Sequence, residues 1–250
     1  MQFYSGGKMT SDLTIEEFIA KQPEYDKNRR ILYPILRLVV SSFCKVEVTG
    51  LENIPRDGQT CLMINHISNL DPIAVTYAVP FRYVISLSKI ENFSLPILGR
   101  LFKLWGTYPI NRGSIDRKAL TQTIELMKSG QLVLMAPEGT RHPEGLAPAK
   151  DGLAYIASKT DVVIVPTAIC GAQDWLTRVK RLRRAYVRLN FGKPFKFKIG
   201  GRARIPREEL GLMIQEAMYQ LAITIPEEYA DGRGVYSDIE NATTEHIEFV

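Results

Sequence analysis

The chain of 250 residues is 45% hydrophobic and 24% charged, and its formal net charge is +5. This composition is typical of a globular protein that buries a sizeable core, and one domain with small appendages is expected. No membrane-spanning helix is expected, because no uninterrupted apolar run in the sequence reaches the roughly 18 to 20 residues that such a helix requires. The polar, Gly-rich first ten residues do not resemble a secretory signal.

The charges are distributed unevenly along the chain. The segment 178–207 contains twelve Lys or Arg and no acid, whereas 208–250 contains ten acids and one Arg, Arg233. Such a distribution predicts an anion-binding surface beside a solvated acidic end. A solvated basic face is the alternative. Binding to nucleic acid is not expected, because no RNA- or DNA-binding motif accompanies the basic segment.

The three cysteines are Cys44, Cys61 and Cys170, and they show no metal-ligand spacing. They are expected to be buried thiols of a reducing compartment. No metal and no other cofactor is predicted.

In chain order, a short helix is expected first, because Thr14 and Glu17 have the spacing of a capping box. An apolar stretch follows at Ile31 to Cys44, interrupted by Pro34 and Arg37. The pattern fits an amphipathic helix lying at a membrane interface. It fits equally an ordinary core helix with Pro34 near its first turn.

Beyond a turn at Gly50, short apolar runs alternate with helical patterns, which predicts an α/β fold with a mixed, largely parallel sheet flanked by helices. The expected strands are 61–65, 83–87, 132–136, 162–169 and 186–191, and the clearest helices are 114–128 and 207–221. Residues beyond Pro226 are expected to be weakly structured. In such sheets, binding sites form where strands end.

His66 and Asp71 follow the first of these strands directly. On one continuous helix they would be about 140° apart, so they meet only if the loop between them folds back. A neutral imidazole paired with a carboxylate is suited to general-base catalysis. The alternative is structural: Asp71 before Pro72 also has the pattern of a helix N-cap, and His66 is then an ordinary loop residue.

Two further loops carry candidate anion-binding residues. Arg112 stands in a Gly-bounded loop, where a guanidinium can hold phosphate bidentately. The segment Pro137 to Arg141 follows another strand and presents Glu138 and Arg141. An exposed loop arginine and a plain turn with an ion pair are the structural alternatives. Lys150 precedes another predicted helix, whose N-terminal amides also favour anions.

These segments, in this order, resemble the glycerolipid acyltransferases of the lysophosphatidate acyltransferase type. The corresponding blocks are Asn65 to Asp71, Gly106 to Arg112, Pro137 to Arg141 and Val162 to Pro166. The resemblance covers roughly residues 50 to 170 and departs modestly from the family pattern, at Ala136, Ala149 and Thr167. It implies a single acyltransferase domain.

The resemblance also implies the role of each residue. His66 is the base that acts on the acceptor hydroxyl, and Asp71 is its partner. The acceptor's glycerol-phosphate end is bound by Arg112, Glu138, Gly139, Thr140 and Arg141, and Lys150 is a further substrate-binding candidate. The implied reaction moves an acyl group from acyl-CoA or acyl carrier protein to the sn-2 hydroxyl of 1-acyl-glycerol-3-phosphate, which gives phosphatidate.

The expected organisation has three parts: an N-terminal helical, membrane-interface segment (1–45), the acyltransferase domain (46–225) and the acidic tail (226–250). The expected partners are a lysophospholipid, an acyl thioester and the cytoplasmic face of a membrane, to which the protein binds peripherally or monotopically. Three alternatives remain. Another acceptor (glycerol-3-phosphate, a different lysophospholipid or an aminolipid) is the first, and a non-catalytic membrane-binding module is the second. A serine hydrolase is the third, but it lacks the Gly-x-Ser-x-Gly motif.

Overall fold

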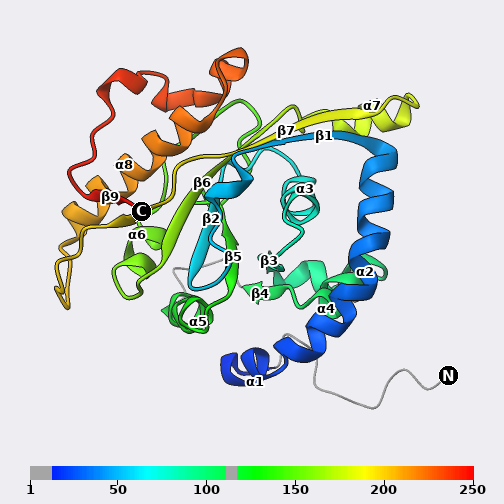
Figure 1. Cartoon of the computed structure of the whole chain (residues 1–250), viewed down its shortest axis with the longest axis horizontal. Coiled ribbons are helices and arrows are strands. Elements are labelled where there is room, and N and C mark those ends of the chain that lie inside the picture. Colours follow the sequence, from blue (N-terminus) through cyan, green and yellow to red (C-terminus); the bar gives the residue numbers. More distant parts are fainter. Residues whose placement is uncertain (1–12, 111–116) are drawn as a thin grey trace.

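A central sheet organises the protein in the computed structural model, which describes residues 13–110 and 117–250 (Figure 1). In that part of the chain, seven strands lie in the order β1-β7-β6-β2-β5-β3-β4, and β8 and β9 extend the sheet beside β6. Strands β2 to β6 are parallel to one another, and β7 runs antiparallel to β6. The strands are β1 (Cys44–Thr49), β2 (Thr60–Ile64), β3 (Val84–Lys89), β4 (Tyr108–Ile110), β5 (Leu132–Met135), β6 (Val163–Cys170), β7 (Ala185–Phe191), β8 (Phe195–Phe197) and β9 (Ile247–Phe249).

Helices cover both faces of this sheet, and each face has its own apolar core. On one face lie α1 (Ile15–Ala20), α5 (Arg117–Lys128), α6 (Gly152–Ala157) and α8 (Arg207–Thr224). The other face is covered by α3 (Asp71–Ala78) and by the last turn of α2 (Gln22–Phe43). Every residue of β2 is buried, so this central strand, which leads to His66, is held rigidly between the two cores.

The predicted architecture is confirmed: a mixed, largely parallel sheet flanked by helices. The five predicted strands correspond to β2, β3, β5, β6 and β7, and the two predicted helices to α5 and α8. The capping box also forms, because Thr14 Oγ1 accepts the Glu17 N–H and Glu17 accepts the Thr14 N–H. The strands β1, β4, β8 and β9 were not predicted.

The helix α2 differs from the simple core-helix alternative. It begins at Gln22, so Pro34 lies in its interior and not near its first turn. Its apolar side chains on one side are exposed, and Ile31 and Leu38 are 69% and 68% accessible. At its N-terminal end, the buried Arg29 donates hydrogen bonds to Trp105 O and Gly106 O, which fixes α2 against α4 (Leu98–Trp105). No helix within the described residues is both long and apolar enough to cross a membrane.

The acidic end of the chain is structured, contrary to the prediction. Residues 226–250 form η4 (Glu227–Tyr236), η5 (Ile239–Asn241) and β9, which pairs with β8. The reason is that several of its polar groups have specific partners. Glu216 of α8 accepts the amide N–H groups of Glu245 and His246, and the buried Arg233 donates to Glu227 and Ile225 O. Composition alone does not show such pairings.

Candidate functional site

The candidate residues gather at one edge of the sheet. Because β2 is parallel to β5 and β6, the carboxyl ends of these three strands lie at the same edge. His66 follows β2 and Glu138 follows β5. The structure therefore brings together two segments that are about seventy residues apart in the sequence.

The loop after β2 folds back on itself, as a contact between His66 and Asp71 requires. His66 Nδ1 lies 2.8 Å from Asp71 Oδ2, and the same oxygen accepts the N–H groups of Ile67 and Ser68, each at 2.8 Å. The Asp71 side chain is completely buried, whereas that of His66 is 14% exposed. Three donors thus fix the carboxylate, and the carboxylate fixes the orientation of the imidazole.

Asp71 does not act as the helix cap that the structural alternative required. It is the first residue of α3, and the cap position is occupied by Leu70, which makes no side-chain cap hydrogen bond. The Asp71 carboxylate points back toward the loop instead, where it binds His66 and two amides. This arrangement favours the pairing with His66 over the purely structural alternative.

Asn65 holds the end of β2 in place, a role that the motif alone did not reveal. Its side-chain amide donates to Ile169 O and accepts from Ile169 N, both at 2.8 Å. These two bonds continue the ladder between β2 and β6 beyond the last paired residue, Ile64. The sequence feature that could have indicated this role is the position of Asn65, whose short amide side chain directly follows a buried strand.

Glu138 lies inside the wall of the site and not on its open surface. It is only 3% exposed, and its Oε1 accepts the His66 N–H at 3.1 Å while its Oε2 accepts the Ala147 N–H at 3.0 Å. Burial raises the pKa of the Glu138 carboxyl, although these amide hydrogen bonds and two nearby histidines act in the opposite direction. A second bond joins the same loops, from His142 N to His66 O at 2.7 Å.

The other residues of this turn line the edge. Gly139 has a φ of +73°, which glycine adopts without strain, and a Cβ atom here would lie 3.2 Å from Lys150 Nζ. Lys150 therefore lies across the Gly139 backbone, which places it beside the Glu138 turn. Thr140 and Arg141 are exposed, and Thr140 Oγ1 lies 2.9 Å from His142 Nε2. Arg112 lies outside the described residues, two positions after the end of β4.

This geometry supports proton transfer at His66. A carboxylate that accepts a hydrogen bond from Nδ1 favours the tautomer in which Nδ1 carries the proton. The lone pair of Nε2 is then available as a base. Among the described residues, none hydrogen-bonds to Nε2. The chain thus presents an oriented base beside the exposed polar groups of Thr140, Arg141 and Lys150.

Comparison with known proteins identifies the family. The family model described as acyltransferase matches residues 45–170, half of the chain. The chain belongs to the acyltransferase family. The matched segment begins in β1 and ends with β6, so it contains every candidate site residue named above.

Individual acyltransferases agree with this assignment. A chloroplastic 1-acyl-sn-glycerol-3-phosphate acyltransferase of Brassica napus is 31% identical over 159 residues, which cover 59% of this chain and 45% of that protein. A 1-acyl-sn-glycerol-3-phosphate acyltransferase of Borreliella burgdorferi is 31% identical over 137 residues, 54% of each chain. This chain thus spans about half the length of these relatives.

A solved acyltransferase structure has the same fold. The crystal structure of the 1-acyl-sn-glycerophosphate acyltransferase PlsC from Thermotoga maritima aligns with a TM-score of 0.58 at 23% identity, covering 81% of this chain and 83% of that one. At this level of sequence identity, the similarity shows only that the two proteins share a fold.

Proposed function

We propose that this protein transfers a fatty acyl group from a thioester to the sn-2 hydroxyl of 1-acyl-glycerol-3-phosphate, which yields phosphatidate. The observation that carries the proposal is the buried Asp71 carboxylate 2.8 Å from His66 Nδ1, in a chain of the acyltransferase family. The names of the relatives favour this acceptor. Acyl-CoA and acyl carrier protein are both candidate donors.

In the proposed reaction, His66 Nε2 takes the proton of the acceptor hydroxyl while its oxygen attacks the thioester carbon. The resulting imidazolium is stabilised by Asp71. The tetrahedral oxyanion then collapses, the C–S bond breaks, and the leaving thiolate takes the proton from Nε2. The substrate supplies the nucleophile, so no Ser or Cys of the chain is acylated.

The phosphate of the acceptor has cationic candidates at the same edge. Arg141 and Lys150 are exposed beside the Glu138 turn, and Arg112 follows β4, whose carboxyl end lies at the same edge as that of β3. Glu138 differs from these residues in its role. Since both of its oxygens accept backbone amides, we propose that it positions the His66 loop and does not bind the acceptor directly.

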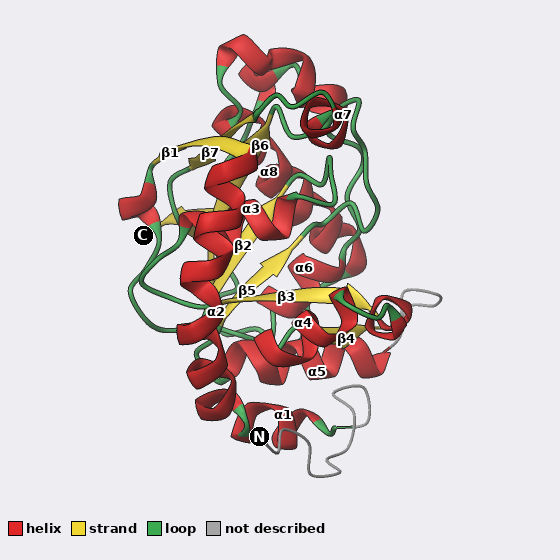
Figure 2. Cartoon of the chain, turned by 90° about the vertical axis from the view of Figure 1, so that its right-hand side faces the viewer, coloured by secondary structure: helices red, strands yellow, loops and turns green. Residues whose placement is uncertain are grey.

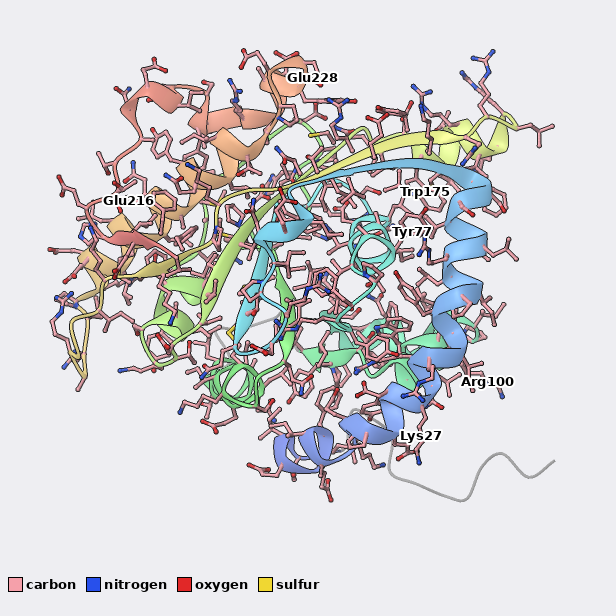
Figure 3. All side chains as sticks on the ribbon, in the orientation of Figure 1. Lys27, Tyr77, Arg100, Trp175, Glu216 and Glu228 are labelled. Carbon is pink, nitrogen blue, oxygen red and sulfur yellow. The ribbon has the colours of Figure 1, made fainter. Side chains whose placement is uncertain are left out.

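We further propose that the protein docks on a membrane through α2 and α4. One side of α2 exposes apolar residues at helical spacing, and α4 does the same with Leu101, Leu104 and its N-cap residue Ile97. Cations border this surface, among them Lys27 of α2 and Arg100 of α4, which Figure 3 labels on the same side of the molecule. The exposed apolar residues of α2 are Ile31, Ile35, Leu38, Val39 and Phe43.

The test is an assay of the purified protein on vesicles that contain 1-acyl-glycerol-3-phosphate, with acyl-CoA or acyl carrier protein as donor. Phosphatidate should form, and His66→Ala should abolish its formation without loss of the fold. Parallel assays with glycerol-3-phosphate, other lysophospholipids and an aminolipid acceptor test the specificity. If folded, vesicle-bound protein forms no phosphatidate with either donor, the proposed reaction is wrong.

A further inference from the structure

The loop between β6 and β7 has an unusual surface. It contains the short helix α7 (Trp175–Lys180) and the connecting residues 181–184. Leu182 is 98% exposed and, within the described residues, is the only non-glycine residue with a positive φ, at +55°. A leucine seldom adopts this backbone conformation, and here its side chain projects almost entirely into solvent.

Cations surround this leucine. Lys180, Arg181 and Arg183 are exposed, and within the described part of the chain no carboxylate pairs with any of them. The nearby Arg178 differs, because it forms an ion pair with Asp174 at 3.1 Å. The loop therefore combines a protruding apolar side chain with three unpaired positive charges.

The loop is attached firmly to the rest of the protein. Arg184 donates hydrogen bonds to Ser41 O (2.6 Å) and Cys44 O (2.8 Å), at the C-terminal end of α2. Trp175, labelled in Figure 3, packs against the core on the α3 side of the sheet. As a result, the loop has a fixed position relative to the exposed face of α2.

Sheet topology places the loop at the same edge as His66. Because β6 is parallel to β2, the segment after Cys170 starts at the edge where the His66 loop also starts. The helix α2 ends there too, since Cys44 pairs with Ala185. Figure 2 shows that α2, α4 and α7 all lie on the side of the molecule that faces the viewer.

We propose that the loop Trp175–Arg184 is a second membrane contact, specific for anionic lipid. Leu182 inserts among the acyl chains, and Lys180, Arg181 and Arg183 bind the net negative headgroups of anionic lipids. The charge complementarity and the continuity with the apolar face of α2 support this occupant. The inference rests on the proposed docking of α2, and it adds a contact that depends on lipid charge beside the His66 edge.

The test measures binding to vesicles and not turnover, so that it can fail independently of the proposed reaction. Binding of the full chain is compared on vesicles of neutral phosphatidylcholine and on vesicles that also contain phosphatidylglycerol. In the double variant Arg181→Gln/Arg183→Gln, affinity for the anionic vesicles should fall roughly 25-fold, about 5-fold for each cation near the surface. Affinity for the neutral vesicles should not change, and added salt should remove the difference.

A matched control changes the same residue type elsewhere. Arg204 lies just before α8 and Arg207 is the first residue of α8, and both are exposed. This end of α8 lies on the side of the molecule opposite α7 (Figure 1). The double variant Arg204→Gln/Arg207→Gln should bind both kinds of vesicle as wild type does. If both double variants lose the same affinity for anionic vesicles, net charge alone determines binding, and the proposed contact would be wrong.

Leu182→Gly separates membrane insertion from folding. Glycine accepts the positive φ, so the thermal stability should not decrease. Vesicle binding should still fall about 10-fold, because an inserted leucine side chain is lost. Unchanged binding in this variant would contradict insertion. If instead the arginine variant binds vesicles normally but loses affinity for an acidic acyl carrier protein, the loop is a protein-binding site and not a lipid contact.

Discussion

At the scale of single residues, the Asp71 carboxylate combines two functions that a substitution can separate. It accepts two amides of the loop and the Nδ1–H of His66 on one oxygen. In Asp71→Asn the side chain keeps an acceptor but loses the charge that stabilises the imidazolium. We expect kcat/KM to fall roughly 10³- to 10⁴-fold, by analogy with the aspartate of a Ser–His–Asp triad.

The measurement is an initial-rate assay, with thermal unfolding as the control for the fold. The variant should remain folded, with stability reduced by about 1 to 3 kcal/mol because charge-assisted hydrogen bonds are weakened. Near-normal turnover would mean that Asp71 only shapes the loop.

Glu138 provides a second prediction at this scale. Each of its carboxylate oxygens accepts one backbone N–H, from His66 and from Ala147. In Glu138→Gln, the new amide group would direct its own N–H toward one of these donors and leave it unsatisfied. We expect a destabilisation of about 1 to 3 kcal/mol. Because the His66 loop would shift, we also expect lower kcat with little change in the KM for the acceptor.

Arg141→Gln is the matched comparison for this variant, because Arg141 is exposed and is proposed to bind the acceptor phosphate. It should raise the KM for 1-acyl-glycerol-3-phosphate and leave the stability unchanged. If Glu138→Gln also acts mainly on the KM, Glu138 binds the acceptor directly and the positioning role is wrong.

The sequence predicted much of the site at this scale, because strand ends and polar side chains are visible in a local pattern. The proximity of His66 to Asp71 required only that a loop fold back. The contact of Glu138 with the His66 amide could not be predicted in the same way. This contact requires that β2 and β5 are neighbours in the sheet, and the order of strands within a sheet cannot be read from a single sequence.

At the scale of whole elements, one carboxylate makes several of the contacts that attach the acidic end of the chain. Glu216 of α8 accepts the Thr243 hydroxyl, the amides of Glu245 and His246, and lies 3.2 Å from His246 Nδ1. Burial alone would raise the pKa of Glu216, but these hydrogen bonds outweigh it and hold the pKa below its ordinary value. The glycines and acidic residues of this segment predicted a weakly structured tail, and these individual contacts explain why the tail is ordered.

The lowered pKa gives a prediction with a defined sign. Because the folded state binds this proton less tightly than the unfolded state, the contribution of Glu216 is present above the unfolded pKa of about 4.3 and is lost as pH falls through the folded pKa. In Glu216→Gln, we expect the free energy of unfolding at pH 7 to decrease by about 1 to 3 kcal/mol. The difference in free energy of unfolding between the variant and the wild type should become smaller at about pH 3.

Chemical denaturation at both pH values measures this difference, and hydrogen exchange locates it. The amides of β9 should exchange faster in the variant at pH 7, whereas those of β2 should not. A loss of stability that is equal at pH 7 and pH 3 would contradict the proposed role of the Glu216 charge.

At the scale of the whole molecule, three surface elements lie at one edge because of strand direction. The ends of β3 and β6 lead into η3 (Ile90–Ser94) and α7, and α2 ends beside the start of β7. The sequence predicted β7 as a strand but not that it runs antiparallel to β6. Only that reversal brings the end of α2 to the His66 edge. The amphipathic pattern of α2 was visible in the sequence, whereas its place relative to the site was not.

The final prediction concerns the exposed face of α2. Ile35 and Leu38 are 55% and 68% exposed, so replacing both with Gln removes few internal contacts and should leave thermal stability unchanged. Vesicle binding should nevertheless fall, roughly 10- to 100-fold, since two inserting apolar side chains are lost. Turnover should fall at low lipid concentration and recover when enough lipid is present to bind the protein.

The matched control makes the same chemical change on α8. Leu212 and Ile223 are 50% and 47% exposed, on a helix at the opposite side of the molecule from α2 (Figure 1). In Leu212→Gln/Ile223→Gln, binding to vesicles should equal that of wild type. If this control weakens binding as much as the α2 variant, general surface hydrophobicity governs association. A selective effect of α2 means instead that one face meets the membrane, and the topology then brings the His66 edge close to the lipid surface that holds the acceptor.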